Sequence, residues 1–125
     1  MLVSVCIGAN DLVTAGLFYD KVLATIDMQR TIEIEGEIGY GPKGGITSLW
    51  VLTPFDGNPA SHGNGTQLIF QAADSNSVDA FHSTAISSGG TDEGPPGPRS
   101  YRKGYYGAYC RDLDGNKLHV FYLPD

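Results

Sequence analysis

The 125-residue sequence predicts an α+β domain built from two copies of one unit, in which a strand and a helix precede three further strands. Short apolar runs typical of strands surround two segments of helical periodicity, and the second half of the chain matches the first after a shift of 63 residues. Residues 104–122 also have the pattern of a closing β-hairpin. We expect a single domain over residues 1–125, with one module at 1–53, a linker at 54–65 and a second module at 66–125.

The first module begins with a strand that leads into a helix. Residues 2–8 form a short apolar run rich in β-branched side chains, which predicts a strand. Asp11 follows as a helix N-cap, and apolar residues then recur at helical spacing, so a helix is expected over residues 11–25. Three further strands are predicted at residues 28–34, 38–40 and 46–52.

The second module repeats this order. Residues 66–72 predict a strand, and the capping residues 73–75 open a second helix that ends before Gly89-Gly90. The Gly- and Pro-rich residues 93–98 are expected to lack regular structure. Two aromatic-rich strands, at residues 105–110 and 117–122, then flank the turn sequence D-L-D-G-N, in which Gly and Asn allow the positive φ angles of a tight reversal.

The repeat aligns equivalent positions of strand, cap and helix. Chance agreement between two strand–helix units is the alternative, but the capping aspartates coincide as well as the apolar residues. The matched pairs are Ser4 with Gln67, Ile7 with Phe70, Asp11 with Asp74, and Phe18 with Phe81. Neither module buries its sheet face alone, so we expect the two to pack together.

Composition excludes several classes of partner. Fourteen acidic and eight basic residues give a net charge of −6, which disfavours nucleic acid and anionic membrane surfaces. The N-terminus carries neither a signal-peptide pattern nor a membrane span, so a cytoplasmic location is expected. Cys6 and Cys110 lie in apolar runs and are expected to be buried free thiols, with a disulfide as the alternative.

The order and spacing of short motifs along nearly the whole chain resemble the vicinal oxygen chelate superfamily, the glyoxalase and bleomycin-resistance-like proteins. The closing D-L-D-G-N-x-L-H resembles that family's D-P-D-G-N-x-[IL]-E. Further motifs are I-G-x-x-D-L at 7–12, F-Y-D-x-V-L at 18–23, V-D-A-F-H at 78–82 and G-Y-Y-G-A at 104–108. The resemblance implies two half-open curved sheets around a shared cavity, and a homodimer.

The resemblance also implies a metal site, which this chain matches poorly. Family ligands are carried on the first and last strand of each module, where this chain has Ser4, Ser48 or Trp50, Gln67 and His119. Only His119 is a good ligand, and no carboxylate offsets the charge of a cation. We therefore expect no cofactor and a degenerate site; the alternative is a divalent metal (Ni, Zn, Mn or Fe) on His119, Gln67 and Ser4. Lactoylglutathione lyase activity is not expected, because the proton-transferring carboxylate is missing.

His119 has two interpretations, a cavity-facing acid/base group and a core histidine that hydrogen-bonds Gln67 or a serine. Arg99, Arg102 and Lys103 form the densest positive charge in the chain, either a solvated loop or a site for an anionic group.

Two functions follow from different classes. The first is binding of a small organic ligand in an aromatic-lined cavity. The second is a metal-dependent lyase, isomerase or dioxygenase-like activity that uses His119 and Gln67. The candidate ligand-binding residues are Trp50, Gln67, Tyr105, Tyr106 and Arg102.

Overall fold

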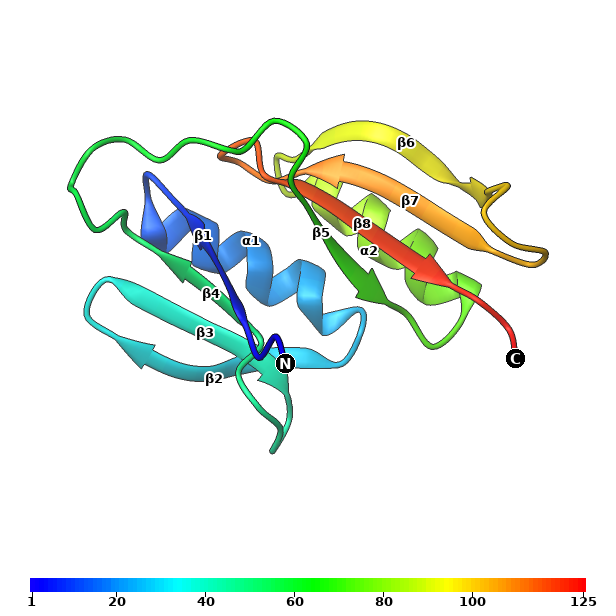
Figure 1. Cartoon of the computed structure of the whole chain (residues 1–125), viewed down its shortest axis with the longest axis horizontal. Coiled ribbons are helices and arrows are strands. Elements are labelled where there is room, and N and C mark those ends of the chain that lie inside the picture. Colours follow the sequence, from blue (N-terminus) through cyan, green and yellow to red (C-terminus); the bar gives the residue numbers. More distant parts are fainter.

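The computed structural model describes residues 1–125 and contains two four-stranded sheets and two helices (Figure 1). The first module comprises β1 (Val5–Gly8), α1 (Leu12–Ala24), β2 (Met28–Ile34), β3 (Glu37–Pro42) and β4 (Leu49–Leu52). The second comprises β5 (Gln67–Gln71), α2 (Ser75–Ser87), β6 (Thr91–Pro98), β7 (Tyr106–Arg111) and β8 (Lys117–Tyr122). This is the predicted α+β class, with paired βαβββ modules.

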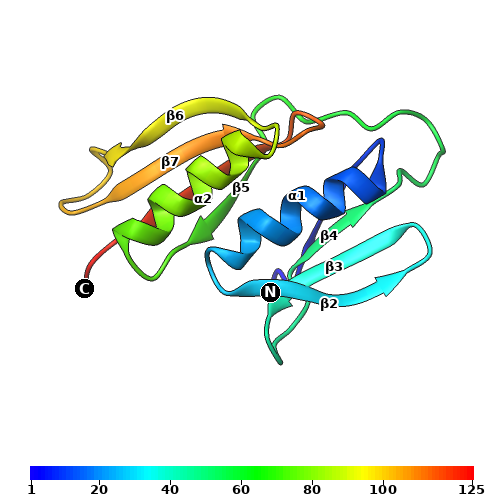
Figure 2. The ribbon, with the colours of Figure 1, turned by 180° about the vertical axis from the view of Figure 1, so that it is seen from behind.

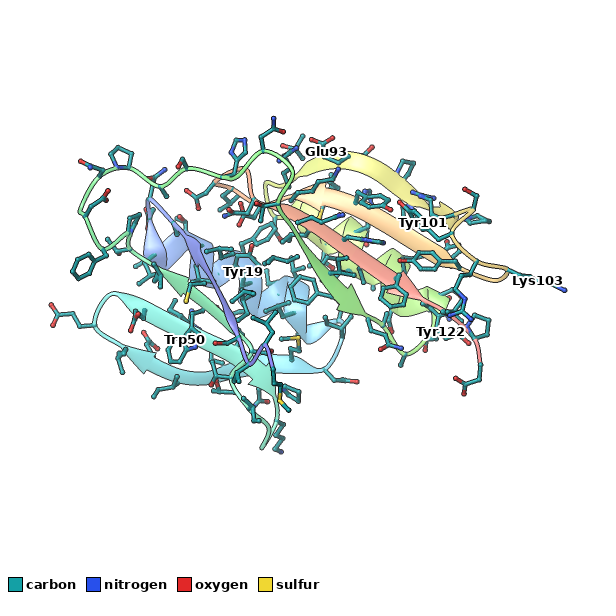
Figure 3. All side chains as sticks on the ribbon, in the orientation of Figure 1. Tyr19, Trp50, Glu93, Tyr101, Lys103 and Tyr122 are labelled. Atoms are coloured by element: carbon teal, nitrogen blue, oxygen red, sulfur yellow. The ribbon has the colours of Figure 1, made fainter.

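The two sheets have equivalent strand orders, β1-β4-β3-β2 and β5-β8-β7-β6, and in each the first strand pairs in parallel with the last. Each helix covers one face of its own sheet, and the modules meet where α1 contacts α2 (Figure 2). The strands of one sheet do not contact those of the other. Both sheets leave their second face uncovered on the same side of the molecule, with Trp50 on one and Tyr101 near the other (Figure 3).

Both helices begin at the predicted caps. The Asp11 carboxylate accepts a hydrogen bond from the Thr14 amide at 3.1 Å, and the Asp74 carboxylate accepts one from the Ser77 amide at 2.7 Å. An N-cap side chain satisfies a backbone donor that the first helical turn leaves free, so the two aspartates fix equivalent starting points. Neither helix is long and apolar enough to span a bilayer.

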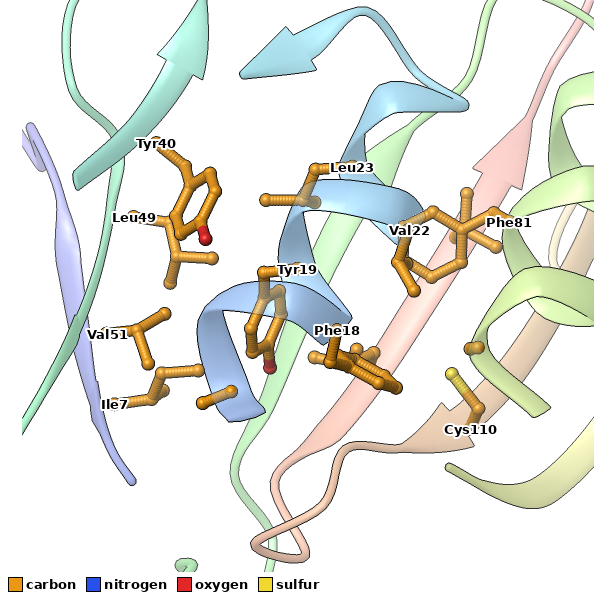
Figure 4. Close-up of a cluster of buried hydrophobic side chains, with 14 of the residues drawn as sticks. Ile7, Phe18, Tyr19, Val22, Leu23, Tyr40, Leu49, Val51, Phe81 and Cys110 are labelled. Atoms are coloured by element: carbon orange, nitrogen blue, oxygen red, sulfur yellow. The ribbon is translucent and has the colours of Figure 1, made fainter. Parts of the chain in front are cut away.

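The core lies between each sheet and its helix and continues between the helices. The matched residues Phe18 and Phe81 are both fully buried. Figure 4 shows Phe18 and Val22 on the side of α1 that faces the second module, and Tyr19 on the side nearer the first sheet. The interface between the modules is therefore part of the hydrophobic core.

The D-L-D-G-N turn also holds the modules together. Asp112, only 6% exposed, accepts hydrogen bonds from the Tyr19 hydroxyl at 2.5 Å and from three donors within the turn. Asp114 accepts one from the Asn10 amide at 3.0 Å, and the Asn116 side chain donates to the Gly8 carbonyl at 3.3 Å. The turn thus contacts the β1–α1 connection of the other module.

The prediction that residues 93–98 lack regular structure is wrong, because they belong to the edge strand β6. β6 is an edge strand that pairs only with β7. Its prolines have no N–H to donate, but no second neighbouring strand requires one. Register shifts on either side of Gly94, at φ +157°, accommodate the irregular sequence.

The prediction that both cysteines are buried is wrong for Cys6. Cys110 is buried, as predicted, and burial raises the pKa of its thiol to about 12. Cys6 is exposed, because it lies on the uncovered face of β1 and not on the face that packs against α1. Both are free thiols.

Candidate functional site

The uncovered face of the second sheet carries a cluster of rings. Along β8, Leu118 and Val120 are buried in the core beneath α2, so the alternating His119 and Phe121 lie on the uncovered face. Tyr109 stands opposite His119 on β7 and shares this face. With two residues of the β6–β7 loop these form the aromatic cluster, which consists of Tyr101, Tyr105, Tyr109, His119 and Phe121.

His119 is the centre of this cluster and is only 4% exposed. Its ring stacks on Tyr109, with centroids 4.3 Å apart, and its Nε2 lies 2.9 Å from the Tyr105 hydroxyl. A Cβ at Gly107 would lie 3.2 Å from the Tyr105 ring and 3.5 Å from Nε2, so glycine leaves room for this pair. The other nitrogen, Nδ1, is buried and has no hydrogen-bond partner.

Tyr101 packs over the outer side of the cluster and remains 64% exposed. Its hydroxyl lies 2.6 Å from that of Tyr109, and its ring meets Tyr105 edge-on at 5.0 Å. Tyr105 in turn stacks on Phe121, with centroids 5.0 Å apart and ring planes 10° apart. The rings are therefore held in place by one another on a sheet face that no helix covers.

Burial and two nearby cations set the charge state of the site. Burial, reinforced by Arg99 and Lys117, lowers the pKa of His119, which favours the neutral imidazole. Burial also raises the pKa of Tyr105 and raises that of Tyr109 to about 12. A neutral imidazole beside a protonated phenol can donate a hydrogen bond to a ligand, accept one from it, or accept a proton from it.

A cavity of about 370 Å³ adjoins the cluster and shares Tyr105 with it. Three predicted ligand-binding residues, Arg102, Tyr105 and Tyr106, line this cavity together with Arg99, Ser100 and Lys103. We call it the basic cavity.

The structure does not bring the remaining predicted site residues into the basic cavity. Gln67 lines a different cavity of about 370 Å³, between the strand edges of the two modules. Trp50 lies on β4 of the first sheet, over Gly39, and far from the aromatic cluster (Figure 3). Although Tyr106 borders the basic cavity, its hydroxyl donates to Asp79 of α2 on the covered side of the sheet.

Tyr101, Tyr109 and Phe121 belong to the cluster but are not among the predicted ligand-binding residues. Phe121 follows His119 by two residues, so strand alternation was a signal for it. Tyr101 lies in an irregular loop, where no periodicity reports the direction of a side chain.

The donors around His119 do not fit a divalent cation. His119 uses one ring nitrogen on Tyr105, and its neighbours on the uncovered face are rings and the aliphatic side chain of Ile69. Gln67 lies on the same face of the adjacent strand, but it is a neutral ligand, and Ser4 is a weak one. No group of three or more His, Cys, Asp or Glu side chains in the structure is arranged to hold a metal ion.

Comparison with solved structures reveals the relatives of the chain. It is 38% identical to a glyoxalase/bleomycin resistance protein from Albidiferax ferrireducens T118, over 98% of each chain, with a TM-score of 0.86. A glyoxalase/bleomycin resistance protein/dioxygenase family enzyme from Burkholderia phytofirmans PsJN is 21% identical over 98% of each chain, with a TM-score of 0.75. Lactoylglutathione lyase from Agrobacterium tumefaciens is 22% identical, over 98% of this chain and 92% of that one, with a TM-score of 0.65.

The last two similarities show the fold alone. No protein-family model matches the chain, and no curated protein does. The first similarity, at 38% identity over 98% of both chains, extends to the sequence as well as the fold. The chain therefore belongs to the glyoxalase/bleomycin resistance protein family of the vicinal oxygen chelate superfamily.

Proposed function

We propose that this protein binds a small planar organic ligand at the aromatic cluster and the adjoining basic cavity. The observation that supports it most is that five rings gather on an uncovered sheet face beside a cavity of about 370 Å³. This volume is within the usual range for small-molecule sites, and stacked rings offer a flat apolar surface at low conformational cost. Tyr105 belongs to both features, so a ligand in the cavity contacts the cluster through it.

Within this site, Tyr105 and His119 supply the polar contacts. Their hydrogen bond orients the phenol, and the unpartnered Nδ1 of His119 is the one buried side-chain polar atom left without a partner. Such an atom costs free energy unless something satisfies it, which is the expected situation for a group that orients a ligand. We assign His119 an orienting or acid–base role and Tyr105 the main contact.

Removal of the Tyr105 ring tests the proposal. N-phenyl-1-naphthylamine, a neutral aromatic dye, is expected to bind saturably. Tyr105→Ser is expected to raise the dissociation constant of this dye about tenfold, because stacking is lost. Phe55→Ser is the matched control, because Phe55 is a fully exposed ring in the linker. Fluorescence titration measures both. Equal affinity in the wild type and in Tyr105→Ser, or no saturable binding, contradicts the proposal.

We also propose that the protein is a homodimer in which a second copy covers the open sheet faces. Ile69 of β5 is 57% exposed beside His119, and the two sheets of one chain do not contact each other. Exposed apolar surface of this kind is a common feature of interfaces. Sedimentation equilibrium should give twice the chain mass of 13.3 kDa, and a single-chain mass at micromolar concentration contradicts this proposal.

The second candidate is a metal-dependent lyase, isomerase or dioxygenase-like enzyme that uses His119 and Gln67. Its support is that these residues lie on the same face of the adjacent strands β5 and β8, and that Nδ1 of His119 is unpartnered. Calorimetric titration of Ni²⁺, Zn²⁺, Mn²⁺ and Fe²⁺ into metal-free protein decides between the two. Stoichiometric binding that His119→Ala abolishes favours the enzyme, and heats no larger than those of dilution favour the metal-free binding protein.

A further inference from the structure

The positive charge of this acidic protein is concentrated at the basic cavity. Arg99, Arg102 and Lys103 are three of only eight basic residues, and none has a carboxylate within salt-bridge distance. Of the five other basic residues, Arg30 and Arg111 are paired with carboxylates, and the three lysines lie outside this cavity. Three uncompensated cations around one cavity, in a chain of net charge −6, make that cavity attractive to anions.

The backbone of the same loop adds neutral donors. The amides of residues 100–104 donate to no acceptor in the protein. On either side of them, the Arg99 amide donates to the Tyr105 carbonyl and the Tyr105 amide donates to the Arg102 carbonyl. The loop turns at Gly104, where φ is +84°. Ser100, Arg102, Lys103 and Gly104 line the basic cavity, so the free amides of this loop add neutral donors for an anion bound there.

Arg99 has a different role from Arg102 and Lys103. Its guanidinium donates to the carbonyls of Gly97 at 3.0 Å, Pro98 at 3.2 Å and Pro95 at 2.6 Å, so it holds the end of β6 in shape. It also lies 5.5 Å from the centre of the Tyr109 ring. Arg99 is therefore a positioning residue that adds to the positive potential of the cavity. The Arg102 and Lys103 side chains line the cavity and make no hydrogen bond within the protein, so they are available to a ligand.

We propose that the basic cavity binds an anionic group, a carboxylate or a phosphate, on the planar ligand that stacks at the aromatic cluster. This inference rests on the proposed function and names the ligand class, an aromatic or similarly planar oxyanion. Tyr105 lines the cavity while its ring stacks on Phe121, so one molecule can place its charge at Arg102 and its ring at the cluster. The guanidinium of Arg102 presents a planar pair of donors suited to either oxyanion.

Two dyes that share one aromatic framework test the charge alone. 8-Anilino-1-naphthalenesulfonate is N-phenyl-1-naphthylamine with an added sulfonate, which stands in for the oxyanion. The anionic dye is expected to bind about tenfold more tightly than the neutral one. The double variant Arg102→Gln/Lys103→Gln should remove this preference, because each exposed charge contributes a modest share of the extra affinity for the anion. The affinity for the neutral dye should stay within about twofold, because this dye has no charge for the two residues to attract.

The matched control is Lys21→Gln/Lys43→Gln, which changes the net charge equally at two exposed lysines outside the cavity. It should keep the preference for the anionic dye, and far-UV circular dichroism should show both double variants folded. An equal loss in the two double variants overturns the inference. So does equal affinity of the wild type for the two dyes, while failure of both dyes to bind overturns the proposed function as well.

Competition identifies the anionic group. Benzoate and phenyl phosphate carry the same ring with different oxyanions, and whichever displaces the anionic dye at lower concentration has the preferred group. Added salt should weaken the anionic dye and spare the neutral one, because screening acts on the charges alone. Displacement by neither compound overturns the inference.

Discussion

Replacement of Asp112 by Ala is expected to lower the free energy of unfolding by about 3–5 kcal/mol. The buried carboxylate accepts four hydrogen bonds, one from the Tyr19 hydroxyl of the first module and three from Asp114 and Asn116 in its own turn. Burial and the adjacent Asp112 raise the pKa of Tyr19 well above its usual value, so the phenol stays protonated and remains a donor. Loss of the acceptor leaves these donors unpaired in the region where the modules meet.

Two variants separate the parts of this effect in urea denaturation followed by circular dichroism. Tyr19→Phe removes only the hydrogen bond from the Tyr19 hydroxyl to Asp112 and should cost about 1.5–3 kcal/mol, the value for a bond to a charged group. Asp114→Ala removes one bond, to the Asn10 amide, at the surface and should cost about 1 kcal/mol. If Asp112→Ala is no more destabilising than Asp114→Ala, the carboxylate does not organise the turn.

The sequence predicted those parts of the fold that local chemistry determines. Asp11 and Asp74 mark helix starts because a side-chain acceptor three residues before a free amide is a local requirement. The reversal at Gly115, where φ is +87°, needed a residue that tolerates the left-handed region, and glycine is that residue. Apolar periodicity then placed Phe18 and Phe81 in the core.

The errors concern features that depend on distant partners. β6 is a strand because β7 offers it one paired side, and an edge position tolerates prolines that a central strand would exclude. Cys6 is exposed because the register of β1 on β4 sets which face meets α1. Neither fact is encoded within a few residues of the segment itself.

The same reason limited prediction of the candidate site. Tyr105, Arg102 and Tyr106 are close in sequence and do share a cavity, whereas Trp50 and Gln67 come from other elements and lie elsewhere. The site also depends on Tyr101, which lies in an irregular loop, and only the tertiary structure determines where its side chain points.

Phe18→Ala and Phe81→Ala are each expected to lower the free energy of unfolding by about 3–5 kcal/mol, because each leaves a ring-sized cavity in a close-packed core. Phe18 of α1 is 2% exposed and Phe81 of α2 is 0% exposed. Phe18 packs edge-on against Tyr19 at 5.0 Å, and Phe81 packs against Phe70 of β5 at 5.6 Å. The two losses should be similar, because the residues hold equivalent positions in the two modules.

Leu17→Ala is the matched control, since Leu17 precedes Phe18 on α1 but is 54% exposed, and it should cost less than about 1 kcal/mol. Thermal and urea unfolding should also remain a single transition in both phenylalanine variants, because the helices that carry these residues contact each other and join the two cores. Two separate transitions, with one module unfolding while the other persists, would show that the α1–α2 contact does not couple the modules. A cost for Phe18→Ala as small as that for Leu17→Ala would remove Phe18 from the core that the structure assigns to it.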